Sequence, residues 1–177
     1  MIWLWRVNPE IFAARRKYQK GTKAWDAVVA SLTIIAYVAI LPVAALDDAR
    51  FRWAPQPDWV VAIGYLLMVA GFAGFTWAQG VNRHFEATVR IQSDRDHEVI
   101  DTGPYAFIRH PGYVAASVMM IGMALALGSL YALIPAAVVV ALLIGRTLGE
   151  EAELRAGLQG YVDYTRRVRF RWIPGLW

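Results

Sequence analysis

The sequence predicts an all-α, polytopic integral membrane helical bundle: four transmembrane helices with a C-terminal cytoplasmic helical tail. Apolar residues make up 58% of the 177 residues and the mean hydropathy is +0.37, whereas about 45–50% apolar is usual in soluble domains. Residues 27–46, 59–79 and 113–145 carry no charged side chain. About 20 apolar residues are enough to cross a bilayer, so the first two runs are each predicted to form one span.

The third run is too long for a single span, because 33 residues would form a helix of about 50 Å. Gly128 and Ser129 lie near its middle. We therefore expect two shorter helices, residues 113–127 and 130–145, the second continuing past Arg146 towards Leu158. The alternative is one long, tilted helix.

The positions of the basic residues favour the hairpin. Sixteen of the 18 Lys and Arg residues lie in residues 1–23, 81–110 and 146–171, and Arg50 and Arg52 are the other two. With four spans the sixteen lie on one side, which the positive-inside rule makes cytoplasmic. Both termini are then cytoplasmic, with residues 47–58 as a short external loop.

Charge and composition also exclude some classes of function. The net charge is +4, but the basic residues flank apolar runs, so membrane lipids are the expected partners and nucleic acid is not. Without Cys the chain has neither disulfides nor thiolate metal sites. We expect no metal site, because nothing places His84, His97 and His110 at ligand spacing. The N-terminus does not have the pattern of a secretory signal.

A first polar cluster, DTGPYAFIRHPGY, occupies residues 101–113. Gly103 and Pro104 favour a turn, and Pro111 biases His110 away from helical backbone. Arg109 and His110 should thus lie on irregular backbone just before a membrane helix. They are either part of a site or interfacial anchors in an aromatic belt.

A second polar cluster follows the third apolar run. Arg146 and Glu150 are four residues apart and share a helix face, either as an internal ion pair or as groups that bind a substrate. Glu151 points about 100° away and is expected to be solvated. Tyr161 and Tyr164, three apart, either line a flat heterocycle or anchor the tail at the interface. Small residues at positions 70, 74 and 78 weakly indicate close helix packing.

The motifs GPYAFIRHPGY, EEAEL and YVDYTRRVRFRWIP resemble those of the isoprenylcysteine carboxyl methyltransferase family. The resemblance covers about half of the chain, residues 90–174, and extends more loosely to phospholipid methyltransferases and membrane sterol reductases. It implies a prokaryotic integral membrane enzyme that uses S-adenosyl-L-methionine. The chain would be a single membrane methyltransferase domain, residues 1–177, with an N-terminal segment (1–26), a two-helix hairpin (27–80) and a catalytic core (81–177).

The resemblance also implies roles for particular residues. Arg146 would engage the substrate, and Arg109 or His110 would meet the cofactor carboxylate, so the expected catalytic residues are Arg146 and Arg109. The expected cofactor-binding residues are His97, Glu98, Val99, Ile100, Tyr105, His110, Pro111, Gly112, Tyr113, Glu150, Tyr161 and Tyr164.

Three departures from the family's pattern leave the prenyl substrate in question. The family usually has additional N-terminal spans whereas only four spans are expected here, Arg90 replaces an uncharged amide, and Arg169 replaces a proline. The acceptor is therefore expected to be a prenylated or other lipophilic small molecule with a carboxylate. The alternatives are methylation of a phospholipid or other lipid amine, a membrane reductase of related fold, and a scaffold without turnover. The expected location is the bacterial inner (cytoplasmic) membrane.

The charge distribution generates a test of topology. A single Cys introduced at Asp163 should be labelled by a membrane-impermeant maleimide only from the cytoplasmic side, because the tail carries six of the sixteen basic residues. No other position of this sequence can be labelled through a thiol, because it contains no native Cys. Labelling of this position from outside alone would contradict the hairpin.

Overall fold

The computed structural model describes residues 2–9, 11–12 and 22–177, and in this part of the chain every regular element is helical. The expected N-terminal basic residues Arg15, Arg16, Lys17 and Lys20 lie outside the described residues. The longer elements are α3 (Ala24–Ala44), continued by a π-helical segment η1 (Ala45–Phe51), α4 (Asp58–Val81), α5 (Pro111–Ala126) and α6 (Leu133–Gly157). The shorter ones are α1 (Ile2–Val7), η2 (Ser93–Arg95), η3 (Gly103–Ala106) and α7 (Tyr161–Arg167).

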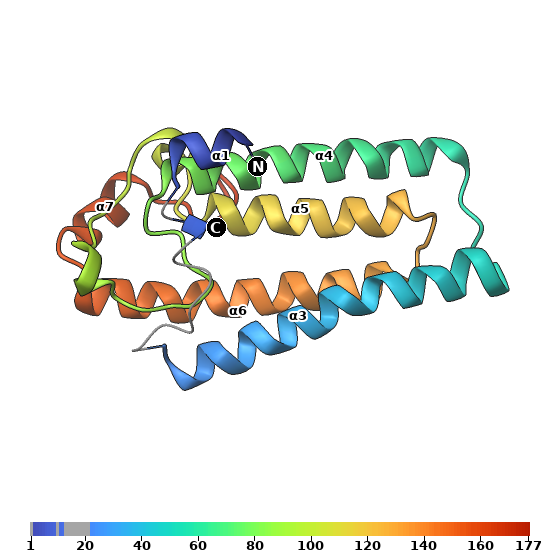
Figure 1. The fold of residues 1–177 in the computed structure, drawn as a ribbon, viewed down its shortest axis with the longest axis horizontal. Coiled ribbons are helices and arrows are strands. Elements are labelled where there is room, and N and C mark those ends of the chain that lie inside the picture. Colours follow the sequence, from blue (N-terminus) through green and yellow to red (C-terminus); the bar gives the residue numbers. More distant parts are fainter. Residues whose placement is uncertain (1, 10, 13–21) are drawn as a thin grey trace. The chain divides into compact units, whose positions relative to one another are not determined.

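The predicted helices are confirmed, including the break in the third run. α5 ends at Ala126, and Gly128 adopts a left-handed backbone with φ of +69° that suits glycine. The last long helix continues to Gly157, and Figure 1 shows it in orange and red ahead of α7. The alternative, a single long helix over residues 113–145, does not form.

Three of the described helices are long and apolar enough to cross a membrane, and this makes the chain an integral membrane protein. They are Ala24–Phe51, Asp58–Val81 and Leu133–Gly157, while Pro111–Ala126 is a shorter apolar helix. Whether α5 is a fourth span stays a prediction.

The described chain divides into two compact units. Unit 1 comprises residues 1–30, 75–112 and 145–177, and unit 2 comprises residues 31–74 and 113–144. The four boundaries between the units, after residues 30, 74, 112 and 144, fall within α3, α4, α5 and α6. Unit 1 contains both polar clusters, and the structure therefore brings these two distant parts of the sequence into one compact body.

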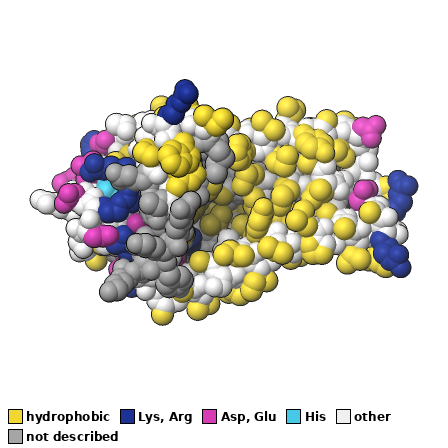
Figure 2. Space-filling model, in the orientation of Figure 1, with side chains coloured by type: hydrophobic (Ala, Val, Ile, Leu, Met, Phe, Trp, Pro, Cys, Tyr) yellow, Lys and Arg dark blue, Asp and Glu magenta, His cyan; other side chains and the backbone are white. Residues whose placement is uncertain are grey.

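Unit 2 is the apolar unit. All its charged residues lie between positions 47 and 58, and Figure 2 shows hydrophobic side chains over much of the visible surface. Exposed apolar side chains such as Ile35, Leu66 and Ile134 face outward from three of its helices. Such a surface suits lipid and would be unfavourable in water.

The expected loop at residues 47–58 begins later than predicted, because the helix continues through η1 to Phe51. Asp47 is fully buried, and its carboxylate accepts hydrogen bonds from the Ser129 hydroxyl (2.6 Å) and the Ala54 N–H (3.1 Å). These bonds compensate the buried charge, so an acidic residue can remain in the helix and hold the turn between α5 and α6.

Glycines bring α4 and α5 into direct backbone contact within unit 2. A Cβ at Gly122 would collide with the backbone N of Met68, one at Gly64 with that of Ala126, and one at Gly71 with that of Met119. Small residues allow membrane helices this approach. The spacing of small residues at positions 70, 74 and 78 correctly identified Gly74, where a Cβ would lie 3.2 Å from the Ala115 Cβ. It did not identify these tighter contacts.

This contact predicts that Gly122→Ala destabilises the protein. Its methyl group has to displace the backbone of α4, and overpacking of this kind costs about 1–3 kcal/mol. Gly145→Ala is the matched control, because nothing lies within 4 Å of a Cβ at that position. Thermal unfolding in detergent should show a lower midpoint for the first variant only; equal midpoints would refute the close contact.

Candidate functional site

The C-terminal half of α6 presents two polar faces to other parts of unit 1. Because successive residues turn by about 100°, Arg146, Gly149 and Glu153 form one face, while Thr147 and Glu151 form another. The first face packs against the start of α3 through three pairs: Arg146 with Asp26, Gly149 with Trp25 and Glu153 with Lys23.

Arg146 forms a buried ion pair with Asp26. Its Nε lies 2.8 Å from Oδ1 of Asp26, and its Nη2 donates to Oδ2 at 3.2 Å and to the Ala87 carbonyl at 2.6 Å. Asp26 is 0% exposed. An internal ion pair was the alternative to a substrate contact for Arg146 and Glu150. The acidic partner that the structure gives Arg146 is Asp26, at the edge of the first apolar run.

Glu151, on the second face, is the centre of a cluster of basic side chains. It is 3% exposed and accepts hydrogen bonds from Nε of Arg109 (2.5 Å) and Nε of Arg171 (3.0 Å), with His110 Nε2 at 3.4 Å. The expectation that Glu151 is solvated is therefore wrong. The helix turns this residue towards the tail and residues 109–110, which the local sequence pattern did not reveal.

The segment before α5 is fixed by the C-terminal tail. The backbone N–H groups of Arg109 and His110 donate to the carbonyls of Phe170 and Arg171, both at 3.0 Å, and Arg109 Nη1 donates to the Val168 carbonyl at 2.7 Å. Arg109 and His110 are buried. They are not interfacial anchors, and the irregular backbone predicted for them obtains its polar partners from protein, as membrane-boundary backbone must.

Three tyrosines form the core beside this network. Tyr161 and Tyr164 are buried with ring centroids 5.7 Å apart, and the Tyr164 hydroxyl donates to the Tyr105 carbonyl at 2.7 Å. Burial, with the charges of Glu151 and Glu150, raises the pKa of Tyr161, and burial also raises the pKa of Tyr105, with Glu150 contributing. The half-buried Glu150 thus lies within electrostatic range of both hydroxyls.

The expected stretch at residues 97–100 is divided among different environments. Val99 packs against the tyrosine core, Ile100 is half-buried, and Glu98 is exposed and paired with Arg83 at 3.1 Å. The His97 ring contacts the His84 ring at a tilt of 39°, with centroids 4.5 Å apart. Burial, followed by the charge of His84, lowers the pKa of His97 to about 4, so its imidazole is neutral at pH 7.

The remaining predicted residues are placed as follows. Pro111 and Gly112 are buried at the start of α5, where a Cβ on Gly112 would lie 2.6 Å from the Phe85 ring. Tyr113 is half-buried and belongs to unit 2. Arg90, the departure from the family's pattern, is buried between Glu86 and Asp94, which hold its Nε and Nη1 at 2.8 and 2.5 Å.

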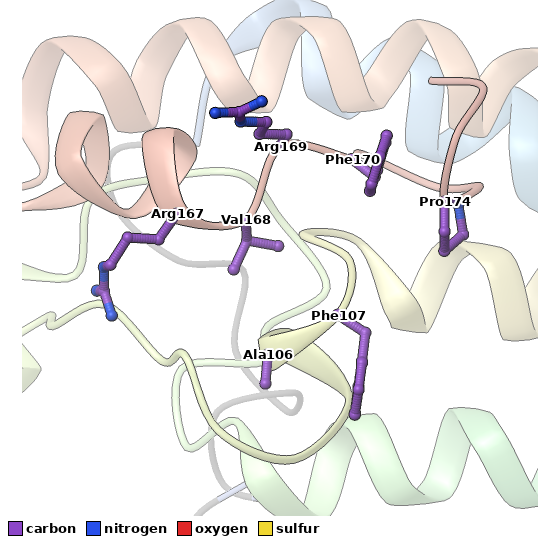
Figure 3. Close-up of a pocket in the computed structure, with 7 residues that line it drawn as sticks. All are labelled: Ala106, Phe107, Arg167, Val168, Arg169, Phe170 and Pro174. Atoms are coloured by element: carbon purple, nitrogen blue, oxygen red, sulfur yellow. The ribbon is translucent and has the colours of Figure 1, made fainter.

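A pocket of about 300 Å³ lies between the segment before α5 and the tail (Figure 3). Ala106 and Phe107 face Val168, Phe170 and Pro174 across it, and its basic lining residues are Arg167 and Arg169. No residue of the expected cofactor set lines this pocket. Among the described residues, no group of three or more His, Cys, Asp or Glu side chains could hold a metal ion.

Sequence analysis missed Asp26 and Glu151 as members of this site. Asp26 directly precedes the uncharged run at residue 27, and a buried arginine such as Arg146 requires an acidic partner. A search for acids next to apolar runs could have found it. Glu151 had no comparable signal, since an adjacent Glu-Glu pair does not reveal which member faces protein.

These features define a membrane protein with an all-helical core whose polar end holds a network of buried charges. A profile of the phospholipid methyltransferase family matches residues 59–156, more than half of the chain. The chain therefore belongs to the phospholipid methyltransferase family.

The fold is similar to that of a solved relative, the eukaryotic intramembrane Ras methyltransferase, isoprenylcysteine carboxyl methyltransferase. The TM-score is 0.66 over 81% of this chain, with 24% sequence identity. This chain covers 52% of the other protein, about half of its length. The predicted family resemblance is confirmed. No curated protein sequence matches the chain.

The Glu151 cluster predicts that Glu151→Ala strongly destabilises the protein. Removing the carboxylate leaves the buried Arg109 side chain without its counter-charge, a change that costs about 3–5 kcal/mol in buried pairs. Glu150→Ala is the matched control, because Glu150 is half-buried and adjacent. Thermal unfolding in detergent should separate the two variants. A Glu151 variant as stable as the control would refute the structural role.

Proposed function

We propose that this protein transfers a methyl group from S-adenosyl-L-methionine to the carboxylate of a lipophilic acceptor. The observation that carries the proposal is the buried Arg146 in a membrane protein of the phospholipid methyltransferase family. The acceptor is a prenylated or other lipophilic small molecule that reaches the site from the bilayer. The proposed location is the bacterial inner membrane, with the site and both termini on the cytoplasmic side.

The donor set around Glu150 suits this cofactor, which supplies an electrophilic methyl group on a sulfonium. The Glu150 carboxylate is half-buried beside Tyr105 and Tyr161 and can accept from an ammonium or hydroxyl group. The neutral imidazole of His97 can face an uncharged heterocycle. Arg109 is already bound to Glu151, so in the proposed site it orients His110 and the start of α5.

The chain's residues then act mainly by orientation. A guanidinium such as that of Arg146 can donate a charge-assisted hydrogen bond to a carboxylate in a fixed direction, which a flexible ammonium sets less precisely. A carboxylate with a pKa of about 4 is already ionised at pH 7 and needs no general base. In-line displacement depends strongly on such positioning.

The second candidate is methylation of a lipid amine, which the name of the matched family favours. An ammonium has to lose a proton before it can attack, so this reaction requires a base. His97 is uncharged at pH 7 and could accept a proton, but the Gln92 N–H already donates to its Nδ1 at 3.2 Å. The carboxylate acceptor makes no such demand and is preferred.

The test begins with cofactor binding. Calorimetry on the detergent-purified protein should show binding of S-adenosylmethionine and none of NADPH, and Glu150→Ala should weaken it roughly 10- to 150-fold, equivalent to about 1.5–3 kcal/mol. Glu153→Ala is the control, because Glu153 pairs with Lys23 on the first polar face of α6. Binding of NADPH instead would replace the methyltransferase assignment with the reductase alternative.

Methyl transfer is then measured with two acceptors: an N-acetylcysteine thioether carrying a long isoprenyl chain, and phosphatidylethanolamine. Esterification of the first compound is the expected result. Transfer to phosphatidylethanolamine alone would establish the amine alternative. Glu150→Ala with unchanged cofactor affinity would show that Glu150 has only a structural role.

A further inference from the structure

The guanidinium of Arg146 is already paired within unit 1. Asp26 contacts two nitrogens of its guanidinium, with Nε 2.8 Å from Oδ1 and Nη2 3.2 Å from Oδ2. The Ala87 carbonyl accepts from Nη2 at 2.6 Å. The plane and direction of the guanidinium are therefore set before any acceptor arrives.

Asp26 is itself held in place. The Val89 N–H donates to its Oδ2 at 2.7 Å, and Asp26 has no exposed surface. The neighbouring Trp25 ring lies so close to Gly149 that a Cβ there would be 2.5 Å from Cη2. The start of α3 is thus pressed against α6, and the Asp26 carboxylate has little freedom to swing away from Arg146.

Stability alone does not explain a pair of this kind. A buried ion pair is often no more stabilising than apolar residues of the same volume, whereas a single buried charge costs several kcal/mol. An arginine that must receive an anionic ligand in a buried place therefore needs a counter-charge while the ligand is absent. Asp26 supplies that counter-charge.

We propose that Asp26 is a positioning residue that aligns Arg146 and competes with the acceptor carboxylate for its charge. The inference rests on the proposed function, in which Arg146 receives a carboxylate. Asp26 has two opposed effects on the reaction: its charge weakens binding of the acceptor, and its ion pair and hydrogen bond hold the guanidinium in the direction that turnover requires.

Asp26→Asn separates these two effects. The amide keeps the shape and one acceptor oxygen but removes the negative charge. The variant should bind a carboxylate acceptor roughly tenfold more tightly, a change of about 1.4 kcal/mol. Its turnover should fall roughly tenfold or more, because small misplacements of a reacting group are costly. A loss of folding alone would not tighten binding.

The experiment compares two probes in detergent: the isoprenylated N-acetylcysteine and its methyl ester. Affinity for each is measured by calorimetry with wild type and Asp26→Asn, and ester formation is followed for the acid. Asp26→Asn should change affinity for the acid and not for the uncharged ester. In an Arg146→Lys background, Asp26→Asn should lower turnover no further, because Asp26 acts through Arg146.

Asp47→Asn is the matched control. Asp47 is equally buried and bound to a hydroxyl and backbone N–H groups, but it belongs to unit 2. Its substitution should leave affinity for the acid within about twofold, the limit expected for independent positions. If Asp26→Asn does not fold, Asp26→Ser keeps an acceptor for the Val89 N–H, and the same tightening is expected.

The outcomes distinguish the two proposals. A wild type that binds the acid better than the ester, together with an Asp26 variant whose affinity for the acid is unchanged or weaker, overturns only the role of Asp26. A wild type that does not distinguish the two compounds overturns the carboxylate acceptor and, with it, the role of Asp26. An equal increase in affinity for the acid in Asp47→Asn would also overturn the inference.

Discussion

The pairing of two buried charges on α6 determines how unit 1 is assembled. Arg146 is neutralised by Asp26, 120 residues earlier in the chain, and Glu151 by Arg109, 42 residues earlier. An unpaired charge at either position would be costly. The start of α3, the segment before α5 and the tail all contact α6 through these two groups, so the polar end of the protein forms as a whole. The proposed acceptor contact uses one pair, and the other fixes the backbone of Arg109 and His110.

Much of the fold could be predicted because the relevant signals are local. Uncharged runs identify the helices, and Gly128 with Ser129 identifies the break, where the left-handed glycine and a hydroxyl bonded to Asp47 are now seen. Pro111 correctly indicated that a helix begins after His110. These features depend on composition and on backbone preferences that act over a few residues.

The site was predictable only in outline, because its details depend on helix rotation and on distant partners. The helix that carries Arg146 and Glu150 was expected, but the pattern could not tell that Glu151 turns towards Arg109 and Arg171. Tyr161 and Tyr164 lie on one turn of α7, as their spacing predicted. They pack in a closed core rather than at an interface. Such outcomes depend on contacts across the whole of unit 1, and the one-dimensional pattern carries little information about them.

The carboxylate of Asp47 has a consequence for the order of events during synthesis. Its partner Ser129 is translated 82 residues later, a delay of about 4–16 seconds at about 5–20 residues per second. Throughout that interval Asp47 lacks the hydrogen bond that it accepts from the Ser129 hydroxyl in the finished protein, whereas the Ala54 N–H that also donates to it is only seven residues away. The local bond can form as soon as residue 54 has been made. The turn between α5 and α6 can close on Asp47 only after Ser129 has been synthesised.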